Sequence, residues 1–371
     1  MESPCDRRMS AARDGTVTRS RPASEEIDVS CKVAFLGLPQ NYAERPTRVE
    51  KVETHFSWVF LTDRCVYKLK KPLRGDGFDF STAQARRRNA EEEVRLNRRL
   101  ASDVYIGVVP LTLDGGYGLA IGGKGVVIDW LVKMVRLPTE GMLDRRLARG
   151  DWHYADIHAL ADCLAKFFAT ARRVPIQPIA YLDRFRAECR ASRRDFHSSG
   201  SPALQRAVNC IVRYVEAFIG RHNDVLLRRL EDRRIVEGHG DLRPEHICLG
   251  SKPRIIDCLE FRLDLRCLDP VAELAFLAME CARLGAPGIG RVLFHHYCKR
   301  TGDCPPPVLI ALYKAIGALI RARIAILHLQ EMPVRDPAKW PKRAADYLEI
   351  ALRECRHLDL SLVRTRRFNR G

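Results

Sequence analysis

Hydrophobic and polar positions change their period along the chain, from strand-like in the first part to helix-like in the second. Residues 49–61 and 65–70 are rich in β-branched and aromatic side chains and flank a polar turn, which is typical of antiparallel strands. Residues 107–111 and 126–135 repeat this pattern across a glycine-rich connection. From residue 139 onward the apolar positions follow helical spacing. The chain is therefore predicted to be an α+β protein, with a small antiparallel sheet followed by a mainly helical part.

One long helix is predicted between the two strand pairs. It would run over residues 83–100, with Ser81 or Thr82 as its N-cap. Its apolar face carries Glu93, and a carboxylate on a buried face needs a cationic partner. Lys68, on the preceding strand, is the expected partner. Alternatively, the glutamates of this helix pair with arginines one turn away.

The second part of the chain is predicted to be a series of helices. The segment 172–235 is arginine-rich and is expected to form two helices around a break at residues 198–202. Further helices are expected at residues 156–172, 270–284, 292–297, 308–329 and 344–352.

A short hairpin within this helical part carries the candidate chemistry. Residues 247–249 and 254–256 are apolar runs separated by a turn-rich break, as in two short paired strands. Asp241 lies in the polar loop before the hairpin and Asp257 directly follows it, so the fold can bring the two carboxylates together. Phosphoryl transfer uses one carboxylate to orient the attacking hydroxyl and another to hold Mg²⁺. Taken alone, the motif also suits a plain turn followed by a strand-end cap.

Composition limits the classes of function. The 371 residues carry a formal net charge of +17, but the basic residues are scattered and no nucleic-acid-reading motif is present, which argues against nucleic acid as the partner. No apolar run reaches the ~18 residues of a membrane span. Residues 1–30 lack an apolar signal segment and are expected to be a disordered tail. The 13 cysteines contain no Cys-x-x-Cys pair, which favours a reducing cytoplasm.

The order of these motifs resembles a known family. His239-Gly240-Asp241 followed by Ile256-Asp257 looks like the catalytic core of the aminoglycoside phosphotransferases, which are similar to the protein kinases in fold. Residues 53–61, 67–72 and 95–100 are similar to a bacterial subgroup that is often fused to a P-loop ATPase domain. The resemblance spans roughly residues 31–330. This chain contains no P-loop motif, so a separate P-loop ATPase is a candidate partner.

The resemblance implies a bilobal, protein-kinase-like architecture. Residues 31–137 would form a nucleotide-binding N-lobe and residues 138–355 a helical C-lobe, followed by a basic tail at 356–371. The backbone of residues 133–138 would link the lobes and bind the adenine of ATP. The acceptor would be a small molecule with a hydroxyl group.

The resemblance also assigns roles to single residues. Asp241 would orient the acceptor hydroxyl, and His239 would fix the loop. Lys68, held by Glu93, would bind the phosphates while Val66 covers the base. Lys70 is the alternative phosphate-binding lysine. In a third interpretation, either lysine simply faces solvent at the edge of the sheet. Asp257 would bind Mg²⁺. Asp269 would accept backbone hydrogen bonds from the catalytic loop.

The sequence departs from the family pattern in three places. His246 stands where the family has asparagine as a second metal ligand. The substitution suits a single-metal site, a shift in preference toward Mn²⁺, binding of phosphate by the imidazole as a cation, or a lost activity. Glu260 replaces a small residue and offers a compensating carboxylate. Residues 54–57 lack a glycine-rich loop. The alternative function is therefore an impaired, kinase-like nucleotide sensor or scaffold. The basic segment 172–235, expected near the acceptor, argues for a neutral or acidic acceptor.

Overall fold

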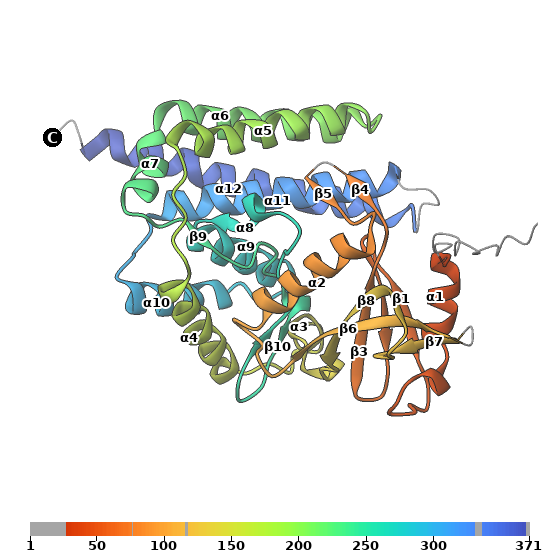
Figure 1. The fold of residues 1–371 in the computed structure, drawn as a ribbon. Helices are drawn as coiled ribbons and strands as arrows, with labels where there is room; N and C mark the ends of the chain where they lie inside the picture. Colours follow the sequence, from red (N-terminus) through yellow and green to blue (C-terminus); the bar gives the residue numbers. More distant parts are fainter. Residues whose placement is uncertain (1–26, 76, 116–117, 331–335, 369–371) are drawn as a thin grey trace, which may run out of the picture.

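The computed structural model describes residues 27–75, 77–115, 118–330 and 336–368. It has a sheet-containing part and a larger helical part, which lie side by side (Figure 1). The sheet has six antiparallel strands in the order β1-β2-β3-β8-β6-β7. Their bounds are β1 Glu50–Glu53, β2 Ser57–Leu61, β3 Cys65–Lys70, β6 Tyr105–Asp114, β7 Gly118–Ile121 and β8 Val126–Val135. The two predicted strand pairs are thus neighbours in one sheet, joined where β3 pairs with β8.

Two helices pack on this sheet and share one buried carboxylate. Helix α1 (Val29–Leu36) begins after Asp28, and helix α2 (Ala83–Asn97) is capped by Thr82, whose side chain accepts a hydrogen bond from the Ala85 amide. Asp129 of β8 binds Arg86 of α2 at 2.8 Å and Lys32 of α1 at 2.8 Å. Because all three side chains are buried, this ion cluster fixes the position of α2 against the sheet.

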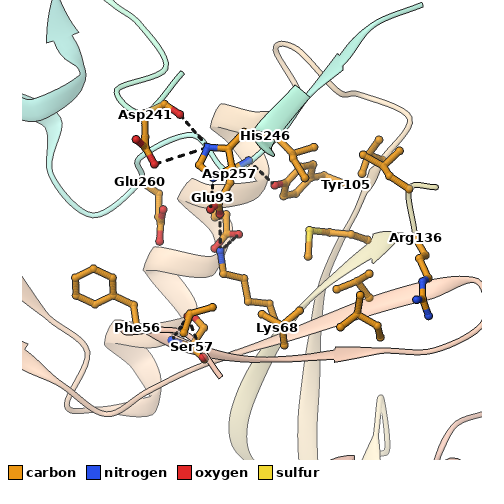
Figure 2. A pocket seen from close by; sticks show the side chains of 18 of the residues that line it. Phe56, Ser57, Lys68, Glu93, Tyr105, Arg136, Asp241, His246, Asp257 and Glu260 are labelled. Atoms are coloured by element: carbon orange, nitrogen blue, oxygen red, sulfur yellow. Dashed lines mark hydrogen bonds and ion pairs between the residues drawn. The ribbon is translucent and has the colours of Figure 1, made fainter. Parts of the chain in front are cut away.

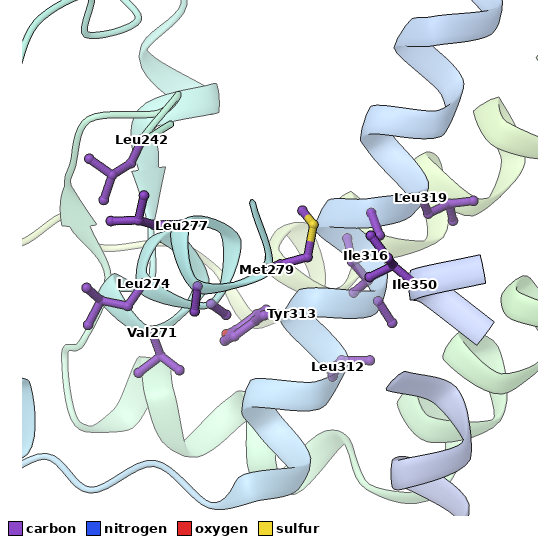
Figure 3. Packing of buried hydrophobic residues seen from close by; sticks show 14 of the residues in the cluster. Leu242, Val271, Leu274, Leu277, Met279, Leu312, Tyr313, Ile316, Leu319 and Ile350 are labelled. Carbon is purple, nitrogen blue, oxygen red and sulfur yellow. The ribbon is translucent and has the colours of Figure 1, made fainter. Parts of the chain in front are cut away.

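The helical part contains the large hydrophobic core. Its helices are α3 Leu143–Arg149, α4 Tyr154–Thr170, α5 Pro178–His197, α6 Pro202–Arg221, α7 Asn223–Glu231, α8 Leu263–Arg266, α9 Pro270–Arg283, α10 Ile289–Thr301, α11 Pro307–Leu327 and α12 Lys339–Phe368. Helix α9 is apolar on most sides and packs against α11, with Leu277 and Met279 of α9 in the same core as Leu312 and Ile316 of α11 (Figure 3). This core supports α9 directly behind the loop that contains Asp241.

Most predicted elements are present, but the segment 172–235 contains three helices, α5, α6 and α7, where two were predicted, because the chain breaks again at His222. The other differences lie in short or terminal segments. Residues 198–201 separate α5 from α6, as predicted, but α12 extends through Phe368, beyond the predicted boundary at 355. Four two-residue strands were too short to be predicted from periodicity: β4 Arg74–Gly75, β5 Phe78–Asp79, β9 Val236–Glu237 and β12 Cys267–Leu268. The predicted hairpin is present and pairs β10 Ile247–Cys248 with β11 Arg254–Ile255. Most of the predicted tail at 1–30 lies outside the described residues. No helix in the described part of the chain has the length and hydropathy to cross a bilayer.

Candidate functional site

A cavity of about 480 Å³ is lined by all of the predicted site residues except His239. One end is apolar and is lined by side chains of β2, β3 and β8 and by residues 134–137, which lead out of the sheet. Charged side chains gather at the other end, away from Arg136 (Figure 2). They are Lys68, Lys70, Glu93, Asp241, His246, Asp257 and Glu260. The cavity therefore has an apolar end suited to a flat ring and a charged end suited to polar groups.

Lys68 joins the sheet, helix α2 and the segment after the hairpin. Its ammonium donates to Glu93 Oε1 at 3.0 Å and to Asp257 Oδ1 at 2.8 Å. The Glu93 side chain is fully buried, so its charge depends on this pairing. The ion pair between Lys68 and Glu93 that was predicted from the sequence is present in the structure. Val66 and Lys68 both line the cavity, as expected for two residues on the same face of a strand.

Lys70, the alternative lysine, forms a second ion pair on the same face of β3. Its Nζ lies 2.5 Å from Glu93 Oε2, and it also pairs with Glu260. Lys70 is 1% exposed, whereas Lys68 is 14% exposed. The five side chains form an alternating chain of charges, Asp257–Lys68–Glu93–Lys70–Glu260. Lys68 is the lysine that lies beside Asp257, and Lys70 is the one enclosed by protein.

The carboxyl groups at the two ends of this series of charges, Asp257 and Glu260, have pKa values shifted in opposite directions. Burial by itself would raise the pKa of Asp257, but the Lys68 ammonium and the nearby His246 hold that pKa well below its usual range. Burial raises the pKa of Glu260 above its usual value despite the partner Lys70. Asp257 also adopts φ 62°, a left-handed conformation that residues other than glycine rarely use. Asp257 is thus an ionised carboxylate held in a strained backbone position, a combination found at functional sites.

His239 fixes the loop that carries Asp241, as the sequence predicted. Its Nε2 lies 2.9 Å from the Ile256 carbonyl, which can only accept, so Nε2 carries the hydrogen. The other ring nitrogen, Nδ1, then accepts the Asp241 amide at 3.3 Å. Burial lowers the pKa of His239 to about 4, with a further contribution from His246, and the ring is neutral at pH 7. The neutral ring therefore joins the loop to the end of the hairpin.

The predicted role of Asp269 is wrong. Glu273, one turn further along α9, accepts the amides of His239 at 3.0 Å and Gly240 at 2.5 Å. Asp269 instead caps α9 through the Val271 amide and pairs with Arg229 at 2.7 Å. Burial raises the pKa of Glu273 to about 7, although the two amides act to lower it. Both acids lie on one helix, and sequence alone did not indicate which one faces the loop.

His246 lies between the two aspartates. Its Nδ1 is 2.9 Å from the Asp241 carbonyl, which can only accept, so this nitrogen carries a hydrogen and Nε2 is the ring nitrogen directed at Asp257. Nε2 is 3.5 Å from Asp257 Oδ2. A backbone carbonyl that fixes the ring in this way is the usual support of a metal-binding histidine.

The donor set around Asp257 is small. No group of three or more His, Cys, Asp or Glu residues that could hold a metal ion occurs in the described ranges. Asp257 and His246 supply one carboxylate and one imidazole at the charged end of the cavity. Protein sites for Mg²⁺ often contribute only one or two carboxylates, the remaining ligands being substrate phosphates and water. The residues present fit a metal ion that arrives with a phosphate ligand.

The motif at residues 95–100 connects α2 to the segment before Asp241 and to the residue after Asp257. Arg99 donates to the carbonyls of Glu237 and Gly238 at 2.7 Å each, just before the loop. Asn97 accepts the Cys258 amide at 2.9 Å and donates to the Glu93 carbonyl at 2.8 Å. In the sequence, this motif was noted only because it resembles the bacterial subgroup, and no contacts were predicted for Asn97 or Arg99. Its hydrogen bonds link Glu93 to the loop before Asp241 and to the residue after Asp257.

Aromatic side chains close the charged end where a glycine-rich loop is lacking. Phe56, in the β1–β2 turn, packs on Phe261 with ring centroids 4.9 Å apart and on Phe78 at 5.2 Å. Phe261 follows Glu260, so the Lys70–Glu260 pair and the Phe56–Phe261 contact lie next to each other along the chain. The sheet and the segment after Asp257 are therefore in direct contact at this end of the cavity.

Comparisons with known proteins match this architecture. No protein-family model matches the sequence. An uncharacterised protein of Mycobacterium tuberculosis is 31% identical over 322 residues, covering 84% of this chain and 60% of that protein. A protein of Mycobacterium bovis gives the same values. The chain thus spans 60% of the length of the curated relatives it matches.

Solved structures share the fold. A choline kinase from Cryptosporidium parvum aligns with a TM-score of 0.53 and 11% identity, covering 90% of this chain and 96% of that one. A choline/ethanolamine kinase family protein from Mesorhizobium loti aligns with a TM-score of 0.51 and 12% identity, covering 89% and 98%. The chain has a protein-kinase-like fold. The predicted fold, an antiparallel-sheet lobe with a mainly helical lobe, is confirmed. In a kinase-like fold, the cavity beside Lys68 and Asp257 corresponds to the cleft between the lobes.

Proposed function

We propose that this protein is an ATP-dependent phosphotransferase that moves the γ-phosphate to a hydroxyl group of a small-molecule acceptor in the cytoplasm. One observation carries the proposal: Lys68, Asp257 and Asp241 converge on the charged end of a single cavity. Lysine, a metal-binding carboxylate and a hydroxyl-orienting carboxylate are the groups that phosphoryl transfer requires in a kinase-like site. The opposite, apolar end provides room for the adenine ring.

Each residue then has a distinct task. Lys68, aligned by Glu93, binds the phosphates. Asp257 and His246 hold Mg²⁺, or Mn²⁺, which neutralises charge on the phosphates. Asp241 accepts the hydrogen bond of the acceptor hydroxyl and keeps it directed at the phosphorus. Because Lys68 already contacts Asp257 at 2.8 Å, nucleotide binding exchanges that contact for contacts to phosphate and metal.

The test separates binding from turnover at Asp241. Asp241→Asn keeps the shape of the side chain but removes the charge that accepts the proton. We expect this variant to bind Mg²⁺-ATP as the wild type does, and to form ADP with hydroxyl acceptors roughly 10²–10⁴-fold more slowly. The exposed Asp232, substituted in the same way, serves as the control and should leave the rate unchanged. Wild-type turnover by Asp241→Asn would contradict the proposed role.

A second function is favoured by His246. Its Nε2 lies 3.5 Å from Asp257 Oδ2, where the family resemblance predicts a second oxygen ligand from asparagine. A protein that binds nucleotide there without transferring phosphate would act as a sensor or scaffold, with a separate P-loop ATPase as a candidate partner. ATP binding without ADP formation in any metal or acceptor would support this alternative.

A further inference from the structure

Two guanidinium groups of the helical lobe act on Asp241, one in direct contact and one through its charge. Arg243 follows Asp241 by two residues, and its Nη1 is 3.6 Å from Asp241 Oδ2. Arg321 comes from α11 and lies close enough for its charge to act on both Asp241 and Arg243. The two side chains are only 18% and 12% exposed. Two partly enclosed cations therefore share the surroundings of one carboxylate.

The hydrogen-bonding capacity of these arginines is incompletely used. Arg243 pairs with Glu245, while the Nε of Arg321 is 3.6 Å from Glu280 Oε1, beyond a hydrogen bond. The Nε atoms of both arginines are buried and have no hydrogen-bond partner in the part of the chain that the structure describes. A buried donor without a partner is costly, and neighbouring cations repel each other. An oxyanion between them would relieve both costs.

The position of Arg321 is set by α9 and α12. Glu280 of α9 is buried; it accepts the Tyr347 hydroxyl at 2.7 Å and pairs with Arg283 at 2.8 Å. The guanidinium of Arg321 lies over the Tyr347 ring, 5.7 Å from its centroid, and that of Arg283 lies 5.3 Å from the same centroid. Glu280 is thus shared by Tyr347, Arg283 and Arg321, and at 3.6 Å its Oε1 is too far from Arg321 Nε to complete a hydrogen bond.

The arginine-rich segment 172–235, expected near the acceptor, engages some of its arginines elsewhere. Arg193 pairs with Glu216 at 2.6 Å, and Arg229 pairs with Asp269 at 2.7 Å. The cations close to Asp241 come from the catalytic loop and α11. The expectation of an acidic acceptor rested on the arginines of 172–235, and the structure adds Arg243 and Arg321 from outside that segment.

We propose that Arg243 and Arg321 bind an anionic group of the acceptor, a carboxylate or a phosphate, and so place the acceptor hydroxyl at Asp241. The inference rests on the proposed phosphotransferase function and specifies its substrate class. Planar guanidinium groups match the paired oxygens of carboxylate and phosphate. A cationic acceptor at this place would be repelled by both arginines.

The test uses four small hydroxyl compounds that differ in charge: glycerate, glycerol 3-phosphate, glycerol and choline. Binding of each to the protein saturated with Mg²⁺-ADP is measured by calorimetry, so that the nucleotide site is already filled. We expect glycerate or glycerol 3-phosphate to bind at least about 10-fold more tightly than glycerol, since hydrogen bonds to charged groups are the stronger ones. Which of the two anions binds better distinguishes a carboxylate site from a phosphate site.

Variants assign the preference to the two arginines. Arg321→Gln and Arg243→Gln should each abolish the advantage of the anion over glycerol, whereas Arg291→Gln, at an exposed position of α10, should preserve it. Retained binding of Mg²⁺-ATP shows that each variant is folded. The proposal is overturned if choline or glycerol binds as well as the anions, if neither anion binds, or if the advantage survives in both variants. Arginine-dependent anion binding without phosphate transfer would uphold the anion site and refute only the proposed function.

Discussion

At the scale of single residues, the loop around Asp241 depends on backbone geometry that few side chains allow. Gly240 has φ 87°, and a Cβ there would lie 2.9 Å from Leu259 Cβ. Gly238 is confined as well, because a Cβ would lie 2.5 Å from Glu273 Oε2. The glycines therefore let Glu273 and Leu259 approach the loop closely enough to hold Asp241 in place.

Gly240→Ala tests this close approach. We expect it to lower the free energy of unfolding by more than the roughly 1–2 kcal/mol that a left-handed alanine costs by itself, because the new methyl group also collides with Leu259. Gly150→Ala is the matched control, since Gly150 has φ 70° with nothing within 4 Å of the added Cβ. Urea denaturation of both variants measures the difference. Equal losses would mean that the loop tolerates the methyl group.

His239 predicts a pH dependence of stability. Its pKa is lowered by burial from 6.5 to about 4, so the unfolded chain binds the proton more readily than the folded one between these values. The stabilisation from the neutral ring is therefore complete above pH 6.5 and is lost as the pH falls toward 4. The full effect is about 3 kcal/mol.

His239→Gln isolates that effect, because glutamine can donate and accept in the same place but does not titrate. Between pH 6.5 and 4 the wild type should lose about 3 kcal/mol more unfolding free energy than the variant. Comparing the two proteins removes the contribution of Glu273, whose raised pKa acts in the opposite direction. Parallel pH curves for wild type and variant would show that the pKa of His239 is the same in the folded and the unfolded protein.

At the scale of elements, two ion pairs join strand β3 to the segment that follows the hairpin. The Lys68–Asp257 pair faces the cavity, and the Asp257 side chain is 45% exposed, whereas the Lys70–Glu260 pair is enclosed, with Glu260 8% exposed. The exposed pair can exchange partners with phosphate and metal. The enclosed pair, together with Phe56 and Phe261, is expected to keep the two segments in register while that exchange takes place.

A double-mutant cycle tests the enclosed pair. Lys70→Met or Glu260→Met alone leaves a buried charge without its partner and should cost roughly 3–5 kcal/mol of stability. The double variant should recover most of this loss, and it should bind Mg²⁺-ATP nearly as the wild type does. Lys68→Met, in contrast, should lose nucleotide binding. If the double variant is stable but does not bind nucleotide, Lys70 contacts the phosphates directly.

The elements also show what a single sequence can and cannot predict. The helix predicted at 83–100 and the hairpin before Asp257 follow from local periodicity and turn residues. The structure contains both, with the helix ending at Asn97. Contacts between residues distant in sequence are harder to predict. Glu260 pairs with Lys70, 190 positions away, and no local sequence pattern indicates this contact. Asp269 and Glu273 are both acidic residues at the start of α9, so only the packing of this helix determines which of them accepts hydrogen bonds from the loop.

At the scale of the whole molecule, the sheet and the helical lobe meet at the cavity, and the charged residues of the site come from both. Lys68 and Glu93 belong to the sheet side, and Asp241, His246 and Asp257 to the helical side. At the end of α2, Asn97 accepts the Cys258 amide and Arg99 donates to the Gly238 carbonyl, and these hydrogen bonds link the two sides. A nucleotide between the lobes would complete a site whose parts are already close together.

Metal-dependent ATP binding tests the central claim most directly. ATP is titrated by calorimetry into the wild type and into Asp257→Ala, each with Mg²⁺, with Mn²⁺ and with a chelator. The proposed site predicts that the wild type binds ATP more tightly with a metal ion and that Asp257→Ala loses this dependence. Binding that ignores both the metal and Asp257, or no binding under any condition, would contradict a nucleotide site at the charged end of the cavity.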